Sequence, residues 1–338
     1  MHNFKKIAEK LAKSDNPSIR WKIRVNYFDE NPDSKAIRKI SQDVKNSPLV
    51  KLLLQNQRKS GRIYSKRSVY DKWQGAHWIL ASLSDIGYPI HDSSLVPAKD
   101  EILETWLSPV FYKEIEVKNE ADVYKVKGVP LMEGRYRRCA SQQGYALYYL
   151  IKLGLFDERL HDLAERLMHW QWSDGGWNCD KKPSAATSSF IETAIPMRGL
   201  FEYSKTYKND LAKSRALSAS EIFLKRHLYK RLSNGEIIDK QFTFLHYPLY
   251  WHYDILGILK ILAEMDLVGD KRCEDALDLL MSKFISEDGW PAERKYYCTS
   301  NEIKLGNDYV DWGGVSKKRA NEWVTADALV VLKKAKCI

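Results

Sequence analysis

Two stretches of the chain match each other and decide the fold: LGLFDERLHDLAERLMHWQWSDGGW, residues 153–177, and MDLVGDKRCEDALDLLMSKFISEDGW, residues 265–290. In each stretch an aspartate, Asp157 or Asp270, precedes a helical pattern, and a tryptophan follows it by 20 residues. Aspartate is a favoured residue at the start of a helix. Apolar residues recur at helical spacing, with charged residues between them. Each stretch is therefore predicted to form an amphipathic helix that ends in a Gly-Trp turn.

Each amphipathic stretch follows a segment that is more apolar on all sides. These segments are SQQGYALYYLIKLG, residues 141–154, and YWHYDILGILKILAEM, residues 250–265. A helix with this composition is expected to be buried on two sides. Weaker copies begin at Trp73, as WQGAHWILASLSDIGYP, and at Ser188, as SSFIETAIPMRGLFEY, with a last copy, NEWVTADALVVLKKA, near the C-terminus. In the copy from Ser188, Pro196 is expected to kink or shorten the helix.

The repeated pair of helices predicts the fold class. One pair cannot bury its apolar faces alone, so successive pairs must stack. Five or six pairs of inner and outer helices that close into a ring give an all-α fold, the α/α toroid. Because no strand-type alternation and no Gly-, Pro- or Ser-rich linker is evident, we predict one domain over residues 1–338. An irregular insertion is expected at about 88–137, where SPVFYKEIEVKNEADVYKVKG interrupts the helical pattern.

The composition is that of a globular protein, with 44% hydrophobic and 29% charged residues. The 11 tryptophans and 19 tyrosines suit either an aromatic-lined cavity or a large helical core. The net charge of +10 permits contact with polyanions. The basic residues are nevertheless spread along the chain, which favours a solvated surface over a nucleic-acid interface.

The cysteines and the N-terminal segment predict a cytoplasmic location. The five cysteines are odd in number and form no CxxC pair, which is typical of a reducing compartment. The segment MHNFKKIAEKLAKSD lacks the apolar core of a signal peptide. No stretch approaches the roughly 18 apolar residues that a membrane span needs.

The segment Gln171–Trp177, QWSDGGW, is similar to the QW signature, and a degenerate form occupies residues 287–290. On these motifs the chain resembles the terpenoid cyclase and protein prenyltransferase β-subunit superfamily, the squalene cyclase-like α/α toroids. Further stretches resemble an uncharacterised prokaryotic group within it: KWQGAHW, RRCASQQG, WQWSDGGWNCD, SSFIETAIP, LHYPLYWHYDIL and NEWVTADAL. The resemblance covers nearly the whole chain. It implies a protein that binds or transforms an isoprenoid or another hydrophobic ligand in an axial, aromatic-lined cavity.

The chain departs from the superfamily in its catalytic motifs. It has no Asp-x-Asp-Asp motif, with which class II cyclases protonate their substrates. None of its cysteines has an aspartate two residues before it, as the zinc motif of the prenyltransferases requires. The sequence therefore leaves open whether the protein is an enzyme. If it is, the resemblance implies a transferase or a cyclase/lyase type of reaction.

The N-terminal ends of the inner helices, which point into the cavity mouth in such a toroid, supply the candidate catalytic residues: His77, Glu192, His252 and Asp254. His252 and Asp254 are two residues apart, so on a helix they do not face each other. One could act as an acid or base and the other orient a partner; otherwise His252 is a histidine bonded within an aromatic core. Glu192 lies on an apolar helix and needs either an arginine partner, Arg138 or Arg198, or a raised pKa.

The same helix ends supply the candidate ligand-binding residues: Arg138, Gln142, Gln143, Tyr250, Trp251, Glu322 and Trp323. Arg137 and Arg138 precede a helix N-terminus and could hold an anion, or simply be surface charges. The candidates for a metal site are His246, Cys139 and Cys179, together with His252 and Asp254 from the catalytic set. Their spacing matches no ligand signature, so the sequence predicts no metal and no cofactor.

Two other classes of function remain open at this point. One is a non-catalytic scaffold or binding protein. The other is a carbohydrate-active enzyme on a helical toroid, in which Glu192 and Asp254 would form the pair of carboxylates.

Overall fold

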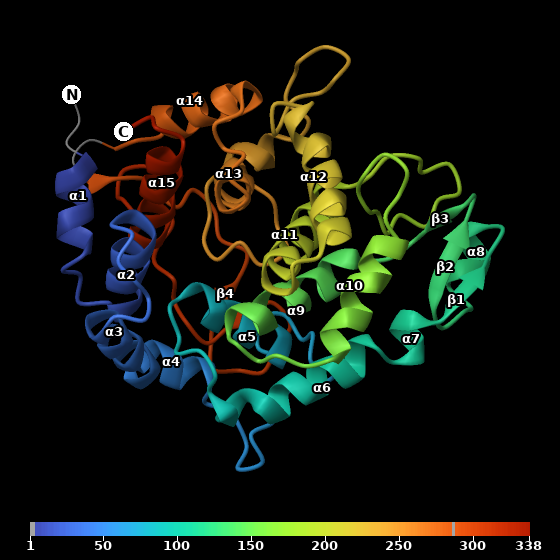
Figure 1. Cartoon of the computed structure of the whole chain (residues 1–338), viewed down its shortest axis with the longest axis horizontal. Helices are drawn as coiled ribbons and strands as arrows, with labels where there is room; N and C mark the ends of the chain where they lie inside the picture. Colours follow the sequence, from blue (N-terminus) through green and yellow to red (C-terminus); the bar gives the residue numbers. More distant parts are fainter. Residues whose placement is uncertain (1–3, 286–287) are drawn as a thin grey trace. The chain divides into compact units, whose positions relative to one another are not determined.

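The computed structural model describes residues 4–285 and 288–338, and it is built mainly of α-helices (Figure 1). The helical character of the predicted all-α toroid is therefore confirmed, and its toroidal arrangement stays a prediction. The chain divides into two compact units. Unit 1 comprises Met1–His91 with Arg226–Ile338, and unit 2 comprises Asp92–Lys225. The expectation of a single domain stays a prediction, and Glu287 of the degenerate QW stretch lies outside the described residues.

Unit 2 holds seven of the α-helices and a small sheet. Its elements are η2 Ser93–Leu95, α6 Val96–Trp106, α7 Pro109–Tyr112, β1 Glu114–Glu116, α8 Glu120–Val123, β2 Val129–Met132, β3 Arg135–Tyr136, α9 Ala140–Lys152, α10 Arg159–His169, α11 Phe190–Tyr207 and α12 Asp210–Leu224. Helix α11 packs against both α9 and α12. The two apolar helices α9 and α11 therefore form the core of this unit, and the amphipathic helix α10 covers α9.

The contact between α9 and α11 depends on two glycines. A Cβ atom on Gly144 would lie 2.5 Å from the Cα of Pro196, and one on Gly199 would lie 2.3 Å from the Gly144 carbonyl oxygen. Only glycine allows the two backbones to approach this closely. Helix α11 continues through Pro196 for 18 residues, so the expected shortening at this proline is wrong. The tight packing against α9 holds the helix on both sides of the proline.

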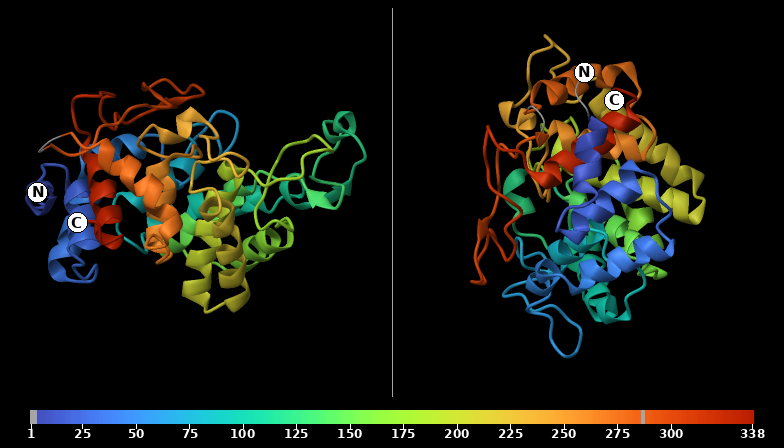
Figure 2. Two further views of the ribbon diagram at one scale, coloured as in Figure 1. Left: turned by 90° about the horizontal axis from the view of Figure 1, so that it is seen from above. Right: turned by 90° about the vertical axis from the view of Figure 1, so that its left-hand side faces the viewer.

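The stretch expected to be irregular contains helix α6 and a three-stranded sheet. Strand β1 pairs with β2 in parallel, and β2 pairs with β3 antiparallel. Val117, Val123 and Met132 form a small hydrophobic core of their own. Figure 2 shows β1–β3 and α8 projecting from the helices of unit 2. These strands could not be predicted from periodicity, because they have only two to four residues, too few for a visible alternation.

Unit 1 combines the two ends of the chain. Its elements are α1 Phe4–Leu11, α2 Pro17–Lys22, the π-helical turn η1 Ile23–Tyr27, α3 Lys35–Asn46, α4 Pro48–Leu53, α5 Ala76–Asp85, η3 Lys240–Thr243, α13 Ile255–Glu264, η4 Lys271–Cys273, α14 Glu274–Ser282, β4 Cys298–Thr299, β5 Asn307–Asp308 and α15 Glu322–Lys334. Helix α15 packs against α1, α2 and α13. Among the described residues, no helix is both long enough and apolar enough to cross a membrane.

Four charged side chains from four helices meet inside unit 1. Lys22 of α2 lies 2.7 Å from Asp85 of α5 and 2.9 Å from Asp327 of α15. Lys260 of α13 contacts the same two carboxylates at 2.6 and 3.0 Å. The hydroxyl of Tyr247 also donates to Asp85, at 2.8 Å. Because the Lys22 side chain is only 1% exposed, its charge depends on these two carboxylates.

The predicted Gly-Trp turns occur once in each unit and are built alike. The Trp177 indole donates to the carbonyl of Leu167, ten residues earlier, at 2.9 Å. The Trp177 amide donates to the Thr193 hydroxyl of the next apolar helix at 3.1 Å. In unit 1, Trp290 makes the equivalent bonds to Leu280 and Thr325, at 2.8 and 2.9 Å. The turns thus join each amphipathic helix to the apolar helix that follows it, as a structural repeat requires.

Candidate functional site

Three residues that are far apart in the sequence meet in unit 2. Cys139 is the N-cap residue of α9, Cys179 follows the Trp177 turn, and Glu192 lies in the first turn of α11. The backbone brings the two cysteines together. Arg137, two residues before Cys139, forms a parallel β-bridge with Asn178, the residue before Cys179. The Arg137 guanidinium then holds the 183–185 loop through two backbone carbonyls.

The polar atoms of these three residues form a compact group. The Cys139 and Cys179 sulfurs and a Glu192 carboxylate oxygen all lie within 4.8 Å of one another. The Cys179 thiol donates to Glu192 Oε1 at 3.5 Å. The other carboxylate oxygen, Oε2, accepts the backbone N–H of Ser141 at 3.1 Å. The carboxylate therefore has one oxygen fixed by the start of α9 and one facing the sulfurs.

Burial and the mutual hydrogen bonds decide which of these groups is charged. The hydrogen bond with Cys179 lowers the pKa of the Cys139 thiol and raises the pKa of Cys179. Burial raises the pKa of Glu192, against the opposing effect of its bond from Ser141. Cys139 is thus the first of the two thiols to ionise, at a helix N-terminus that itself favours a thiolate.

The predicted ligand-binding residues Arg138, Gln142 and Gln143 lie beside this group and bind one another. The Arg138 guanidinium donates to Gln143 Oε1 at 3.0 Å and to Gln142 Oε1 at 2.8 Å. It also lies 4.9 Å from the centre of the Phe111 ring. Its positive charge lowers the pKa values of Cys139 and Glu192. The charge of Arg138 acts on the Glu192 carboxylate and opposes the rise in its pKa that burial causes.

The distance between Cys179 and Glu192 fits an edge of a tetrahedral zinc site. Zinc binds sulfur at about 2.3 Å and carboxylate oxygen at about 2.0–2.2 Å. A tetrahedron with those bond lengths has a sulfur-to-oxygen edge of about 3.5 Å. The measured distance from Cys179 Sγ to Glu192 Oε1 is 3.5 Å. The donor set of two thiols and one carboxylate also suits a thiophilic divalent ion.

Helix α13 of unit 1 begins later in the sequence than predicted. The helix begins at Ile255 rather than at Tyr250, because the Asp254 carboxylate caps it by accepting the Gly257 amide at 2.6 Å. The second oxygen of Asp254 lies 2.7 Å from His246 Nδ1, and both side chains are 1% exposed. Asp254 therefore orients His246, a residue that the sequence placed only among metal candidates.

His252 lies in an aromatic stack ahead of that helix. Its ring packs between Trp251, at a centroid distance of 4.1 Å, and Tyr296, at 3.6 Å. Burial lowers the pKa of His252 to about 3, so the ring is neutral at pH 7. Tyr250 stacks on Trp73 at 4.0 Å, and its hydroxyl donates to the buried Asp308.

The remaining predicted site residues, His77, Trp323 and Glu322, contact other side chains of the protein. His77 is fully buried against Tyr70 and Trp78, and burial lowers its pKa to about 3. Trp323 stacks on Tyr247 at 4.9 Å with nearly parallel rings. Glu322 is exposed and accepts a hydrogen bond from Ser14.

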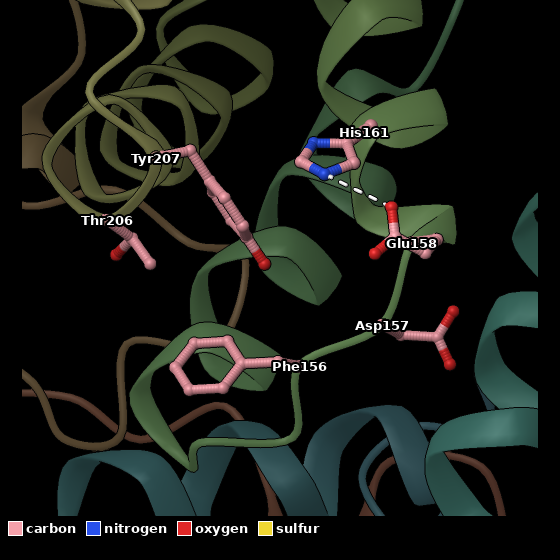
Figure 3. A pocket seen from close by; sticks show the side chains of 6 residues that line it. All are labelled: Phe156, Asp157, Glu158, His161, Thr206 and Tyr207. Atoms are coloured by element: carbon pink, nitrogen blue, oxygen red, sulfur yellow. Dashed lines mark ion pairs between the residues drawn. The ribbon is translucent and has the colours of Figure 1, made fainter.

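A hollow of about 590 Å³ in unit 2 contains none of the predicted site residues (Figure 3). It is lined by Phe156, Asp157, Glu158, His161, Thr206 and Tyr207. Its ionisable groups already have partners within the protein. Asp157 binds Lys99 at 2.6 Å and Arg159 at 2.7 Å, and His161 Nδ1 lies 2.7 Å from the Tyr203 hydroxyl. We assign no chemistry to it.

Of the predicted site residues, Glu192 with Arg138, Gln142 and Gln143 are brought together, and Cys139 and Cys179 join them. The repeat contained a signal for this group, because each member lies at the start of an apolar helix or just after a Gly-Trp turn. No protein-family model matches the chain, and no curated protein is found to be similar to it.

Proposed function

We propose that the protein binds one Zn²⁺ ion per chain through Cys139, Cys179 and Glu192. The observation that supports this most is the convergence of two thiols and a carboxylate oxygen within 4.8 Å in a half-buried place. Two thiols and a carboxyl so close to one another exchange their protons for a metal readily, because every ligand binds in its deprotonated form. The proposal replaces the expectation from sequence spacing that the chain has no metal site.

The number of protein ligands favours a reactive metal over a structural one. Structural zinc sites have four protein ligands, whereas catalytic sites have three and an open position for water or substrate. In residues 4–285 and 288–338, the group contains three cysteine, histidine or acidic side chains. A bound ion would supply Lewis-acid chemistry at the open position. Arg138, whose charge acts on the same group, would attract a negatively charged atom of a substrate there.

The experiment is a titration of the reduced, metal-free chain with Co²⁺, which replaces Zn²⁺ and reports its ligands by absorption. The wild-type chain should bind one equivalent with a sulfur-to-metal charge-transfer band. Cys139→Ser and Cys179→Ser should each abolish or strongly reduce that band. Glu192→Gln should weaken binding by at least the roughly 10–100-fold that loss of an outer-shell partner costs.

The matched control is Cys298→Ser, which removes an exposed cysteine of unit 1 and should leave the titration unchanged. A wild-type chain without the charge-transfer band contradicts the proposal. The same holds if the band survives in both cysteine variants while circular dichroism shows them to be folded.

The ligand class and the full architecture are the second part of the proposal. A hydrophobic, isoprenoid-type ligand rests on the resemblance to the cyclase and prenyltransferase superfamily, as does a toroidal closure of the helix pairs. The alternation of apolar and amphipathic helices within each unit supports the repeat on which that closure depends. Native mass spectrometry of the purified chain tests the ligand: a hydrophobic molecule released on denaturation supports it, and a chain that neither retains nor takes up added isoprenoids argues for a scaffold.

A further inference from the structure

Three buried polar atoms gather in a short segment of unit 1 without a hydrogen-bond partner among the described residues. They are His246 Nε2, Trp251 Nε1 and His252 Nδ1. Buried polar atoms are almost always paired, and leaving one unpaired costs about 1–3 kcal/mol. Three such atoms within seven residues require partners from outside the described polypeptide, which are either ordered water or a bound ligand.

His246 is held in the orientation that a metal-binding histidine usually has. Its Nδ1 lies 2.7 Å from Asp254 Oδ2, and the backbone N–H of His246 donates to the same oxygen at 3.0 Å. Because a carboxylate only accepts hydrogen bonds, the proton of a neutral His246 ring is on Nδ1, which leaves the lone pair of Nε2 for a metal. Histidines that bind metals almost always donate their second nitrogen to a carboxylate or carbonyl in this way.

His252 places a second imidazole at a suitable distance. A metal bound at about 2.0–2.1 Å by one nitrogen of each ring lies about 3.2 Å from each ring centre, so the centres are at most about 6.4 Å apart. The measured distance between the ring centres of His246 and His252 is 5.9 Å, with the planes at 87°. The stack with Trp251 and Tyr296 fixes the plane of the His252 ring.

We propose that His246 Nε2 and His252 Nδ1 bind a transition-metal ion, with Asp254 orienting the first of them. Imidazole ligands suit Zn²⁺, Cu²⁺ and Ni²⁺. Two protein nitrogens leave positions for water or a small oxygen ligand, for which the Trp251 indole N–H is an available donor. The site contains no sulfur and belongs to unit 1, so the inference does not depend on the proposed thiolate site of unit 2.

The test is the stoichiometry of Zn²⁺ binding, measured by equilibrium dialysis of the full-length chain. The double variant Cys139→Ser/Cys179→Ser isolates the histidine site and should still bind one equivalent. Adding His246→Gln or His252→Gln to it should remove that equivalent. In the wild-type background, either histidine change should lower the stoichiometry by one and leave the cobalt–sulfur charge-transfer band intact. His91→Gln, at an exposed histidine, is the control and should change nothing.

The result that overturns the inference is a double cysteine variant that is folded and binds no Zn²⁺, Cu²⁺ or Ni²⁺ with a Kd below about 0.1 mM. Binding that is unchanged by both histidine substitutions overturns it equally. Loss of the sulfur band in the wild-type chain would count only against the thiolate site, so the two proposals fail in different measurements.

Discussion

At the scale of single residues, the partners of a buried group decide its chemistry. His246 and His77 are both buried, but His246 has the Asp254 carboxylate against one ring nitrogen. His77 is surrounded by the rings of Tyr70 and Trp78, and burial lowers its pKa to about 3. His77 is fully buried and therefore stays neutral in the folded chain across the physiological range.

The low pKa of His77 predicts a dependence of stability on pH. An unfolded chain protonates this histidine near pH 6.5, whereas the folded chain does so only near pH 3. Between these values the unfolded state binds the extra proton, so stability falls as the pH falls, by about 1.4 kcal/mol per pH unit. Replacing His77 with phenylalanine should remove this contribution. Urea unfolding at pH 7, 6 and 5 measures it, with His91→Phe as the exposed control; equal slopes in wild type and His77→Phe would refute the prediction.

At the scale of helices and strands, close backbone contact fixes how the apolar helices pack. Gly144 of α9 lies against Pro196 and Gly199 of α11. The start of α9 holds Cys139, and the start of α11 holds Glu192. The packing of these two helices therefore sets the distance between two of the proposed zinc ligands.

Gly144→Ala tests this contact, because the added Cβ would lie 2.5 Å from a backbone atom of Pro196. The helices must separate to accommodate it, and overpacking of this kind costs about 1–3 kcal/mol or more. We expect a lower melting temperature and at least tenfold weaker cobalt binding. Gly269→Ala, where the added Cβ has open space, should change neither. Unaltered stability of Gly144→Ala would show that the helices are not held this tightly.

The helix pairs could be predicted from the sequence, and the proposed ligand group only in part. The predicted helix over residues 141–154 is observed as α9, residues 140–152, because its apolar pattern is long and regular. Glu192 stood out as a carboxylate on an apolar helix. Cys139 and Cys179 were named among the metal candidates but were not linked to Glu192, because their proximity depends on the pairing of Arg137 with Asn178, which no local pattern encodes. Strands of two to four residues are similarly invisible to periodicity.

At the scale of the whole molecule, the ion pairs of Lys22, Asp85, Lys260 and Asp327 unite residues from both ends of the chain. The first two precede unit 2 in the sequence and the last two follow it. Two lysines and two carboxylates balance their charges in a place with little solvent. These four residues were not predicted to meet, because they lie on four helices that are far apart in the sequence.

Lys22→Met should destabilise the protein by about 3–5 kcal/mol, since it leaves two carboxylates to share one lysine in a buried place. The loss should appear as a lower urea midpoint in equilibrium unfolding. Lys10→Met removes a lysine whose side chain is 75% exposed and should cost less than about 1 kcal/mol. Similar midpoints for the two variants would mean that the buried charges contribute little to the stability of unit 1.

The most direct test of the account is anomalous X-ray diffraction at the zinc absorption edge, from crystals of the reduced full-length chain grown with Zn²⁺. The account predicts a strong peak about 2.3 Å from both the Cys139 and Cys179 sulfurs and about 2.0–2.2 Å from a Glu192 oxygen. Absence of a peak between these residues, in crystals whose other sites show that zinc was present, would contradict the central claim.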